Sequence, residues 1–304
     1  MTVLLLAVVL DLVLGDPPNR FHPVSWIGRL IAAGRRCADR VPPRFLVIYG
    51  AALIGAVVGV AFIGGRAAQT TAAWLPWPLG LFAQAWLLKC SFSLRGLVVA
   101  VGQVRGALAS GDLAAARSAL ALHLVSRPVD SLDRGAVASA AVESLSENLT
   151  DSWVAPLCFY VVGGIPAAWA YRSVNTADAM IGYREGLLER LGAAAARLDD
   201  VLNLLPARLA ALAVVAGAGL ASASPSRAWR AWRRDAAATA SPNAGHTMAA
   251  MAGALGVTLE KHGHYRLGGG AAPGITDIDR AVRIAASAAG VSLSAVFILL
   301  RVFW

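Results

Sequence analysis

The sequence predicts an all-α protein: a polytopic helical membrane protein with about four to six membrane segments, some of which can be re-entrant, plus interfacial helices. Two observations predict this class. Of the 304 residues, 57% are hydrophobic and only 15% are charged, whereas a soluble domain carries about a quarter charged residues. The hydrophobic residues also gather into long runs, and no repeat or flexible linker separates them. We therefore expect residues 1–304 to form a single integral membrane domain.

Each apolar run approaches the length needed to cross a bilayer core, which takes roughly 20 helical residues. Uncharged runs cover 45–65, 152–171, 209–226 and 285–300, and another covers 74–88 and continues past two basic residues to 104. The first run, 2–14, is shorter and contains Asp11. It lacks a basic leading segment and a small-residue cleavage site, so we expect a retained first membrane segment rather than a signal peptide.

The net charge of +9 follows the predicted topology. If the spans alternate from an outside N-terminus, the inside segments 15–44, 105–150 and 222–285 hold 18 Lys and Arg residues, and the outside segments 66–73, 172–202 and the tail hold six. This asymmetry obeys the positive-inside rule. Because the basic residues lie between spans rather than on one face, nucleic acid is not expected as a partner. We expect the protein in the inner (cytoplasmic) membrane of a bacterium.

Residues 226–238 read SRAWRAWRRDAAA and predict a basic helix. Trp229 and Trp232 stand about one helical turn apart among four arginines. Such a helix would lie in the headgroup region of the bilayer. The alternative is a substrate-binding arm.

An acidic stripe precedes the run that begins at residue 152. Glu143, Glu147 and Asp151 recur at i, i+4 and i+8, so a regular helix would project all three from one face. Three like charges repel unless a cation neutralises them, and a hard cation such as Mg²⁺ prefers oxygen ligands. The alternative is a solvated helix face at a membrane boundary.

Other polar residues cluster near the ends of the apolar runs. Asp16 and His22 follow the first run. Beyond residue 171 lie side chains that suit anions and cations: Arg172, Asn175, Asp178, Arg184, Asp199, Asp200, Asn203 and Arg208. Asp199, Asp200 and Asn203 could instead cap the helix that carries Pro206. A turn at 241–246 carries Asn243 and His246.

These clusters lie in stretches that resemble the signature blocks of the CobD/CbiB family of adenosylcobinamide-phosphate synthases, membrane enzymes of cobalamin biosynthesis. The stretches are DLVLGDPPNRFHPVSWIGRLI (11–31), ESLSENLTDSWVAPL (143–157), YRSVNTADAMIGYR (171–184), ARLDDVLNLLPARL (196–209) and SPNAGHTMAAMAGALGV (241–257). They appear in family order and span nearly the whole chain.

The resemblance implies an ATP- and Mg²⁺-dependent ligase that joins the free propionate carboxylate of adenosylcobyric acid to (R)-1-amino-2-propanol or its O-phosphate. Cobalt would enter only with the corrinoid substrate. By hypothesis, Glu143, Glu147 and Asp151 hold Mg²⁺ with ATP, and the catalytic residues are Glu147, Asp151 and Asp178. Substrate or phosphate binding is assigned to Asp16, His22, Asn148, Arg172, Asn175, Arg184, Asp200, Asn203, Arg208 and Asn243. The active site is expected on the cytoplasmic side.

The chain departs from the family pattern at two places. A Gly-Arg-Asp-Thr-like stretch is expected where the chain reads Ser126-Arg127-Pro128-Val129. An aromatic residue is expected where His246 stands, which argues against a family-wide catalytic role for this histidine. Strict alternation of spans also places 172–202 outside, unless Gly163 and Gly164 make the preceding span re-enter.

Two other classes of function stay open. A distant relative of the family is a non-catalytic membrane sensor of β-lactamase induction, but a sensor would not need the acidic stripe together with Asn175 and Asp178. A transporter would carry its polar residues mid-span, whereas here most lie at span ends. The expected partners are the lipid bilayer, adenosylcobyric acid, aminopropanol or its phosphate, and ATP, with room for a homo-oligomer.

Overall fold

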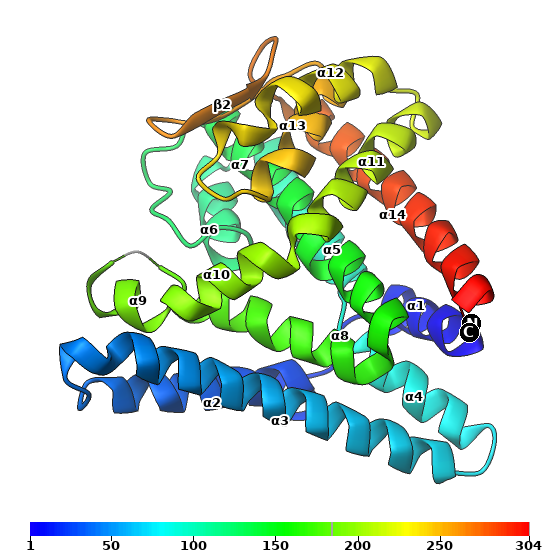
Figure 1. The fold of residues 1–304 in the computed structure, drawn as a ribbon. Helices are drawn as coiled ribbons and strands as arrows, with labels where there is room; N and C mark the ends of the chain where they lie inside the picture. Colours follow the sequence, from blue (N-terminus) through cyan, green and yellow to red (C-terminus); the bar gives the residue numbers. More distant parts are fainter. Residues whose placement is uncertain (184, 304) are drawn as a thin grey trace. The chain divides into compact units, whose positions relative to one another are not determined.

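The computed structural model describes residues 1–183 and 185–303, most of which are helical (Figure 1). The predicted all-α class is therefore confirmed. Contacts divide the chain into two compact units, each assembled from separate stretches. Unit 1 contains Met1–Ser93, Ala155–Asn203 and the residues from Leu299 on, and unit 2 contains Leu94–Val154 and Leu204–Ile298.

Unit 1 is built around one long apolar helix. Its helices are α1 (Thr2–Leu14), α2 (Pro23–Ala38), α3 (Leu46–Trp74), α4 (Leu79–Lys89), α8 (Ala155–Ile181), α9 (Gly186–Leu191) and α10 (Ala193–Leu202). The helix α3 packs against α2, α4, α8, α9 and α10, and α1 packs against α4. Ile31, Ile54 and Ile181 are buried in the shared aliphatic core of α2, α3 and α8.

The helix α8 is broken inside its apolar stretch. Gly163 and Gly164 have non-helical backbone angles, and Gly164 has a φ of 67°, a conformation that favours glycine. The ribbon of α8 turns sharply partway along its length (Figure 1). The interruption that the Gly-Gly-Ile-Pro sequence predicts is therefore confirmed.

Unit 2 combines helices with one small hairpin. Its helices are α5 (Leu94–Ala109), α6 (Leu113–His123), α7 (Arg134–Leu149), α11 (Leu204–Leu220), α12 (Pro225–Asp235), α13 (Ala244–Leu255) and α14 (Ile275–Phe303), the last of which ends in unit 1. A π-helical segment, Thr150–Val154, follows α7 directly. The antiparallel strands β1 (Thr258–Lys261) and β2 (Tyr265–Gly268) contact α7 and α13. Sequence reasoning did not predict this hairpin.

Several helical stretches are long and apolar enough to cross a membrane. Pro43–Trp74, Arg134–Ile181 and Ile275–Val302 qualify by themselves. Two pairs of consecutive helices, α4 with α5 and α10 with α11, raise the number to five if each pair is one broken span. The helix α1 is apolar but shorter. The protein is thus a polytopic helical membrane protein, as predicted.

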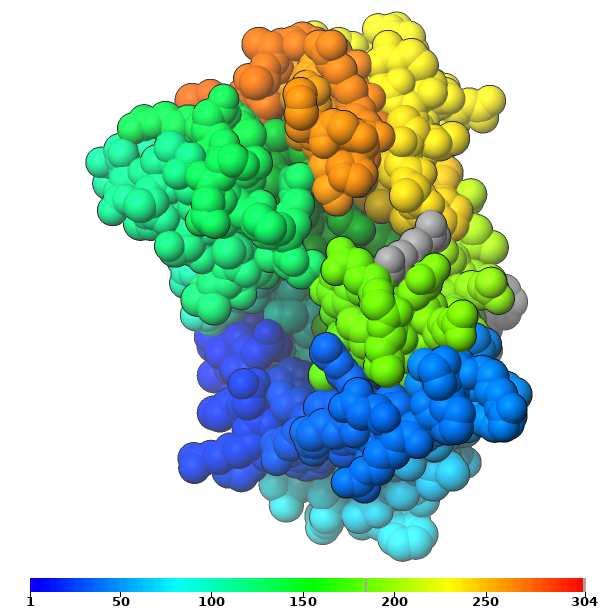
Figure 2. All heavy atoms as spheres, turned by 90° about the vertical axis from the view of Figure 1, so that its left-hand side faces the viewer, coloured from blue at the N-terminus to red at the C-terminus, as the bar shows by residue number. Residues whose placement is uncertain are grey.

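The polar parts of unit 2 come from two segments that the charge pattern assigns to one side of the membrane. The helices α6 and α7 belong to segment 105–150, and α12, α13 and the hairpin belong to segment 222–285. The helix α7 packs against α13 and β1. In the space-filling view, the hairpin region (orange) lies beside the region of α6 and α7 (blue-green) (Figure 2). The two segments therefore form one polar region.

Candidate functional site

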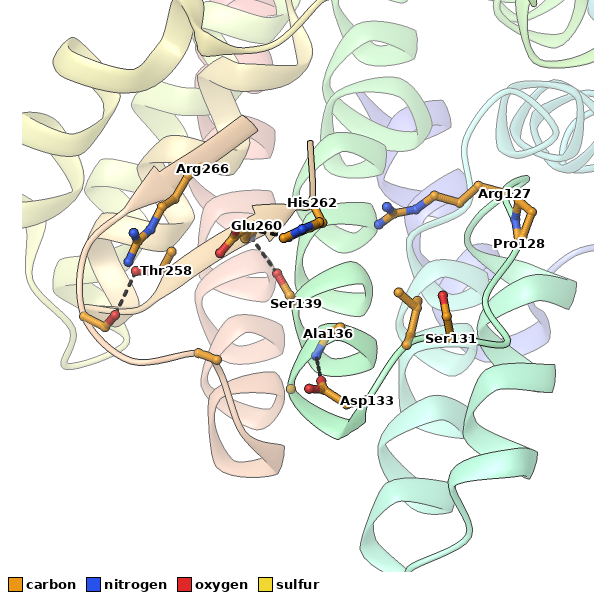
Figure 3. A pocket seen from close by; sticks show the side chains of 14 residues that line it. Arg127, Pro128, Ser131, Asp133, Ala136, Ser139, Thr258, Glu260, His262 and Arg266 are labelled. Atoms are coloured by element: carbon orange, nitrogen blue, oxygen red, sulfur yellow. Dashed lines mark hydrogen bonds and ion pairs between the residues drawn. The ribbon is translucent and has the colours of Figure 1, made fainter. Parts of the chain in front are cut away.

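A cavity of about 510 Å³ opens in unit 2 between the hairpin and the loop that leads into α7. Its polar lining includes Arg127, Ser131, Asp133, Glu260, His262 and Arg266. Arg127 extends from the loop toward His262 on the hairpin (Figure 3). Pockets of this size hold small-molecule ligands in many proteins, and the lining offers both basic and acidic partners.

The hairpin is attached to α7 through a buried carboxylate. The Ser139 hydroxyl accepts a hydrogen bond from the backbone N–H of Glu260 at 3.0 Å and donates to Glu143 Oε1 at 2.7 Å. The hydroxyl of Tyr265 donates to Glu143 Oε2 at 2.8 Å. Ser139 and Glu143 are almost fully buried. Glu143 thus holds both strands through two hydroxyl groups.

A smaller cavity of about 180 Å³ is lined by Glu143 and Tyr265 of this attachment. Arg127, Glu143, Glu147, Lys261 and Tyr265 are among its lining residues. Arg127 lines both cavities, and its guanidinium lies 3.8 Å from Glu143 Oε2. The positively charged side chain of Arg127 therefore faces both the larger cavity and the smaller one, and the smaller cavity is also lined by the carboxylates of Glu143 and Glu147.

The environment of Tyr265 keeps its hydroxyl protonated. Burial raises the pKa of Tyr265 well above its ordinary value, and the negative charges of Glu143 and Glu147 raise this pKa further. A protonated phenol is a donor, which matches its hydrogen bond to Glu143.

The acidic stripe is only partly regular. Glu143 and Glu147 lie on α7, but Asp151 lies in the π-helical segment, where a turn takes more residues than in an α-helix. The regular α-helix that the i, i+8 alignment assumes therefore ends before Asp151. Among the residues that the structure describes, no three His, Cys, Asp or Glu side chains are arranged to hold one metal ion.

The donor set accordingly fits Mg²⁺ at one carboxylate rather than three. Both oxygens of Glu143 already accept hydrogen bonds. Mg²⁺ commonly takes one or two carboxylates together with substrate phosphates and water. Glu147 lines the smaller cavity and is the candidate ligand. The metal-binding roles of Glu143 and Asp151 stay predictions. Glu143 is the less suitable ligand of the two, because both of its oxygens already accept hydrogen bonds.

A second polar network lies within unit 1, between α8 and α10. Arg172 donates to Asn175 Oδ1 at 2.9 Å, and Asn175 donates to Asp199 at 3.4 Å. The amide of Asn203 donates to Asp199 at 3.0 Å and accepts from the buried Tyr171 hydroxyl at 3.0 Å. Four predicted positions thus join one network.

The capping interpretation fits the position of Asn203, which directly precedes α11 and its Pro206, but not the two aspartates. Asp199 and Asp200 lie in the last turn of α10 rather than before a helix. Asp178 lies on α8 next to Gly182, where an added Cβ would come within 2.0 Å of its carboxylate. Arg184 lies outside the described residues.

The cluster around Asp16, also in unit 1, contains a partner that sequence reasoning missed. The ammonium of Lys89, fully buried on α4, pairs with Asp16 and lies 3.3 Å from the buried carboxylate of Asp11. The Ser93 hydroxyl donates to Asp16 at 2.6 Å. Burial raises the pKa of Asp16, but hydrogen bonds from His22, Lys89 and Ser93 outweigh this effect and hold the pKa below its ordinary value.

His22 also shapes the local backbone. Its Nδ1 accepts from the backbone N–H of Val24 at 3.2 Å and caps α2. Its Nε2 lies 3.8 Å from Asp16. Asp16 and His22, which lie close together in the sequence, are therefore also close in the structure.

The remaining predicted positions lie in unit 2. Asn148 donates to the Ser144 carbonyl at 2.9 Å, and Asn243 precedes α13 and is nearly buried. Arg208 donates to the carbonyl of Leu204 at 2.6 Å. His246 Nδ1 accepts from the indole of Trp232 at 2.8 Å, and burial together with the charge of Arg208 lowers the pKa of His246. This packing role agrees with the low priority given to His246 as a catalytic residue.

Comparison with known proteins identifies the family. The model of a family described as CobD/Cbib protein matches residues 4–293. The chain belongs to the CobD/CbiB family. A cobalamin biosynthesis protein CobD from Dehalococcoides mccartyi is 41% identical over 272 residues, which is 88% of this chain and 86% of the relative.

Other CobD/CbiB relatives are similarly distant. The cobalamin biosynthesis protein CbiB of Salmonella typhimurium is 38% identical over 266 residues, covering 86% of this chain and 82% of the relative. A probable CobD protein of Methanothermobacter thermautotrophicus is 40% identical over 267 residues, covering 88% and 86%. No solved structure matches the chain. Membership of the CobD/CbiB family assigns this protein to cobalamin biosynthesis.

The CobD/CbiB match covers most of both units and every candidate residue. It does not by itself point to Lys89, Tyr265 or Arg127, which the structure adds to the candidates. Two of these residues had a signal in the sequence. Lys89 is a charged residue within the apolar run 74–104, and Arg127 lies where the family pattern predicts a Gly-Arg-Asp-Thr-like stretch. Tyr265 had no such signal.

Proposed function

We propose that this CobD/CbiB chain is an ATP-dependent amide ligase. It would join the free propionate carboxylate of adenosylcobyric acid to (R)-1-amino-2-propanol or its O-phosphate, giving adenosylcobinamide or its phosphate. The observation that carries the proposal is the pair of cavities in unit 2 that share Arg127 and have Glu147 on one wall. Family membership supports it.

The reaction needs activation because a carboxylate and an amine do not condense in water. A substrate carboxylate oxygen would attack the γ-phosphorus of ATP and release ADP, leaving an acyl phosphate. The amine nitrogen would then attack the carbonyl carbon, the bond to phosphate would break, and the nitrogen would lose a proton. An acyl adenylate with pyrophosphate as the leaving group would serve equally, and identification of the nucleotide product distinguishes the two.

The residues around the cavities suit these steps. The guanidinium of Arg127, aligned beside Glu143, would bind phosphate oxygens, since arginine matches their geometry. Glu147 would hold Mg²⁺ or accept the proton from the attacking amine. Mg²⁺, when bound, would offset the charge of the phosphates. The catalytic roles of Asp151 and Asp178, and phosphate binding by Arg172, belong to the same proposal and need separate tests.

The deciding experiment uses purified protein in detergent with MgATP, adenosylcobyric acid and aminopropanol phosphate, and follows the corrinoid by mass spectrometry. Wild type is expected to form product, and Glu147→Gln to lose about 10²-fold or more of the rate, as expected for loss of an acid–base group. Glu189→Gln, an exposed acidic residue on α9, is the matched control and should retain activity.

Each outcome separates the candidate functions. Catalysis in detergent excludes a transporter as the sole function, because transport needs a sealed vesicle. Equal rates for wild type and Glu147→Gln would keep the ligase and remove Glu147 from its centre. If the folded wild type forms no product with either form of the amine, the non-catalytic sensor becomes the better explanation.

A further inference from the structure

The apolar helices of unit 2 change to polar sequence at a common level. The guanidinium of Arg105 on α5 makes two hydrogen bonds, at 2.9 and 2.8 Å, to Asp279 on α14. Beyond Arg283, α14 has no charged residue from Ile284 to Leu300. Charged residues are costly inside the bilayer core, so the first uncharged turn of α14 marks the membrane boundary in unit 2.

The helix α11 ends at this boundary. A Cβ added to Gly217 would lie 2.7 Å from the backbone nitrogen of Ala288 and 3.1 Å from the carbonyl oxygen of Ile284, so α11 contacts α14 directly there. Leu220, the last residue of α11, follows Gly217 by about 4.5 Å along the helix axis. The helix α12 begins at Pro225 and therefore starts close to the headgroup level.

The two faces of α12 have different environments. Ala228, Ala231 and Trp232 are buried, and α12 packs against α13. The indole of Trp232 is bonded to His246. Trp232 is therefore covered by protein rather than by lipid.

The opposite face is basic. Arg227, Arg230 and Arg233 are exposed, and at 3.6 residues per turn they lie within an arc of about 120° opposite the buried residues. Arg227 stands at the edge of this arc, and its guanidinium lies near Gly256, where an added Cβ would be 3.6 Å from it. Trp229, beside this arc, is 44% exposed. Asp235 is the one acidic residue of α12, and it is paired with Arg234. No acidic residue of α12 therefore offsets the charge of the other three arginines.

We infer that the outward face of α12, formed by Arg227, Trp229, Arg230 and Arg233, binds the headgroups of anionic phospholipids. Guanidinium groups bind phosphate oxygens in two-point contacts, and indole rings favour the membrane interface. Because α12 is fixed on α13 at the boundary of the apolar helices, this binding would fix the depth of the polar part of unit 2 relative to the membrane surface.

The test places a fluorophore on this face. Ser226 is exposed within the same arc, so Ser226→Cys in a Cys37→Ser background carries an NBD label. The full-length protein is reconstituted into nanodiscs of phosphatidylcholine alone or with 30% phosphatidylglycerol, both with a headgroup spin label. Quenching is expected to be several-fold greater with phosphatidylglycerol, and R227Q/R230Q/R233Q should remove the difference, since each basic residue strengthens anionic-surface binding about five-fold.

Two controls isolate the effect. R35Q/R36Q/R40Q removes the same charge from exposed positions in unit 1 and should leave quenching unchanged, and R227K/R230K/R233K should retain most of it. Equal quenching in both lipid compositions, or an unchanged signal in the triple glutamine variant that elutes as folded protein, would overturn the inference. So would a response to a single-stranded oligonucleotide in neutral nanodiscs without any response to phosphatidylglycerol.

Discussion

At the scale of single residues, the carboxylate of Glu143 connects α7 to the hairpin. Removal of the Tyr265 hydroxyl leaves one oxygen of a buried carboxylate without this donor, which costs about 1–3 kcal/mol. We expect Tyr265→Phe to lower the free energy of unfolding by that amount and to speed hydrogen exchange in 258–268. Tyr183→Phe, at an exposed tyrosine, is the matched control. Unchanged exchange in the hairpin would show that Glu143 does not hold it.

The buried charges of Lys89 and Asp11 give a second prediction. Lys89→Met leaves Asp11 inside apolar helices without its cation, and removal of one partner from a buried pair costs about 3–5 kcal/mol. The double variant D11L/K89M should recover part of this loss because no isolated charge remains on Asp11. Thermal unfolding in detergent measures both, with Arg36→Met as the exposed control. Additive losses in the double variant would contradict the pairing.

Residues that act alone were easier to predict from sequence than residues that act in pairs. Asp11, Asp16 and His22 stand out because charge is rare in an apolar context. Lys89, the partner of both aspartates, lies 73 residues beyond Asp16, and the packing of α1 on α4 brings it to them. The network of Arg172, Asn175 and Asn203 was predicted by composition, but its connection through Asp199 requires the fold.

At the scale of elements, the loop between β2 and α14 depends on glycine. Gly270 has a φ of 123°, and an added Cβ would lie 2.3 Å from the carbonyl oxygen of Gly256. Because Gly270 lines the larger cavity, we expect Gly270→Ala to destabilise the protein by about 1–3 kcal/mol and to raise the KM of a substrate. Gly269→Ala, where nothing lies within 4 Å of the added Cβ, should have little effect. Similar KM values for both variants would argue against this cavity as a binding site.

Element prediction succeeded where the local signal was strong. Long uncharged runs predicted α3 and the apolar part of α14, and the Gly-Gly-Ile-Pro sequence predicted the break in α8. The hairpin was missed because its four-residue strands are too short for a clear alternating pattern. The π-helical segment has no simple sequence signal, and for this reason the position of Asp151 relative to Glu147 could not be predicted.

At the scale of the whole molecule, the organisation into two discontinuous units was beyond sequence reasoning. The chain passes between the units at four places, and no linker or change of composition marks them. The basic segments, in contrast, predicted that 105–150 and 222–285 share a side, and their packing in unit 2 agrees. The same charge pattern predicts that this polar region faces the cytoplasm.

Cysteine labelling can determine that side. Ser110 and His264 are exposed in the two segments of unit 2, and Ala73 is exposed near the end of α3. In a Cys37→Ser background, we expect Ser110→Cys and His264→Cys to react with a membrane-impermeant maleimide only from the cytoplasmic side, and Ala73→Cys only from the opposite side. The physical reason is the excess of Lys and Arg in the segments retained inside. Labelling of Ser110→Cys and His264→Cys from opposite sides would contradict the packing of unit 2. Labelling of both from outside would instead separate the candidate site from cytoplasmic ATP and weaken the proposed ligase mechanism.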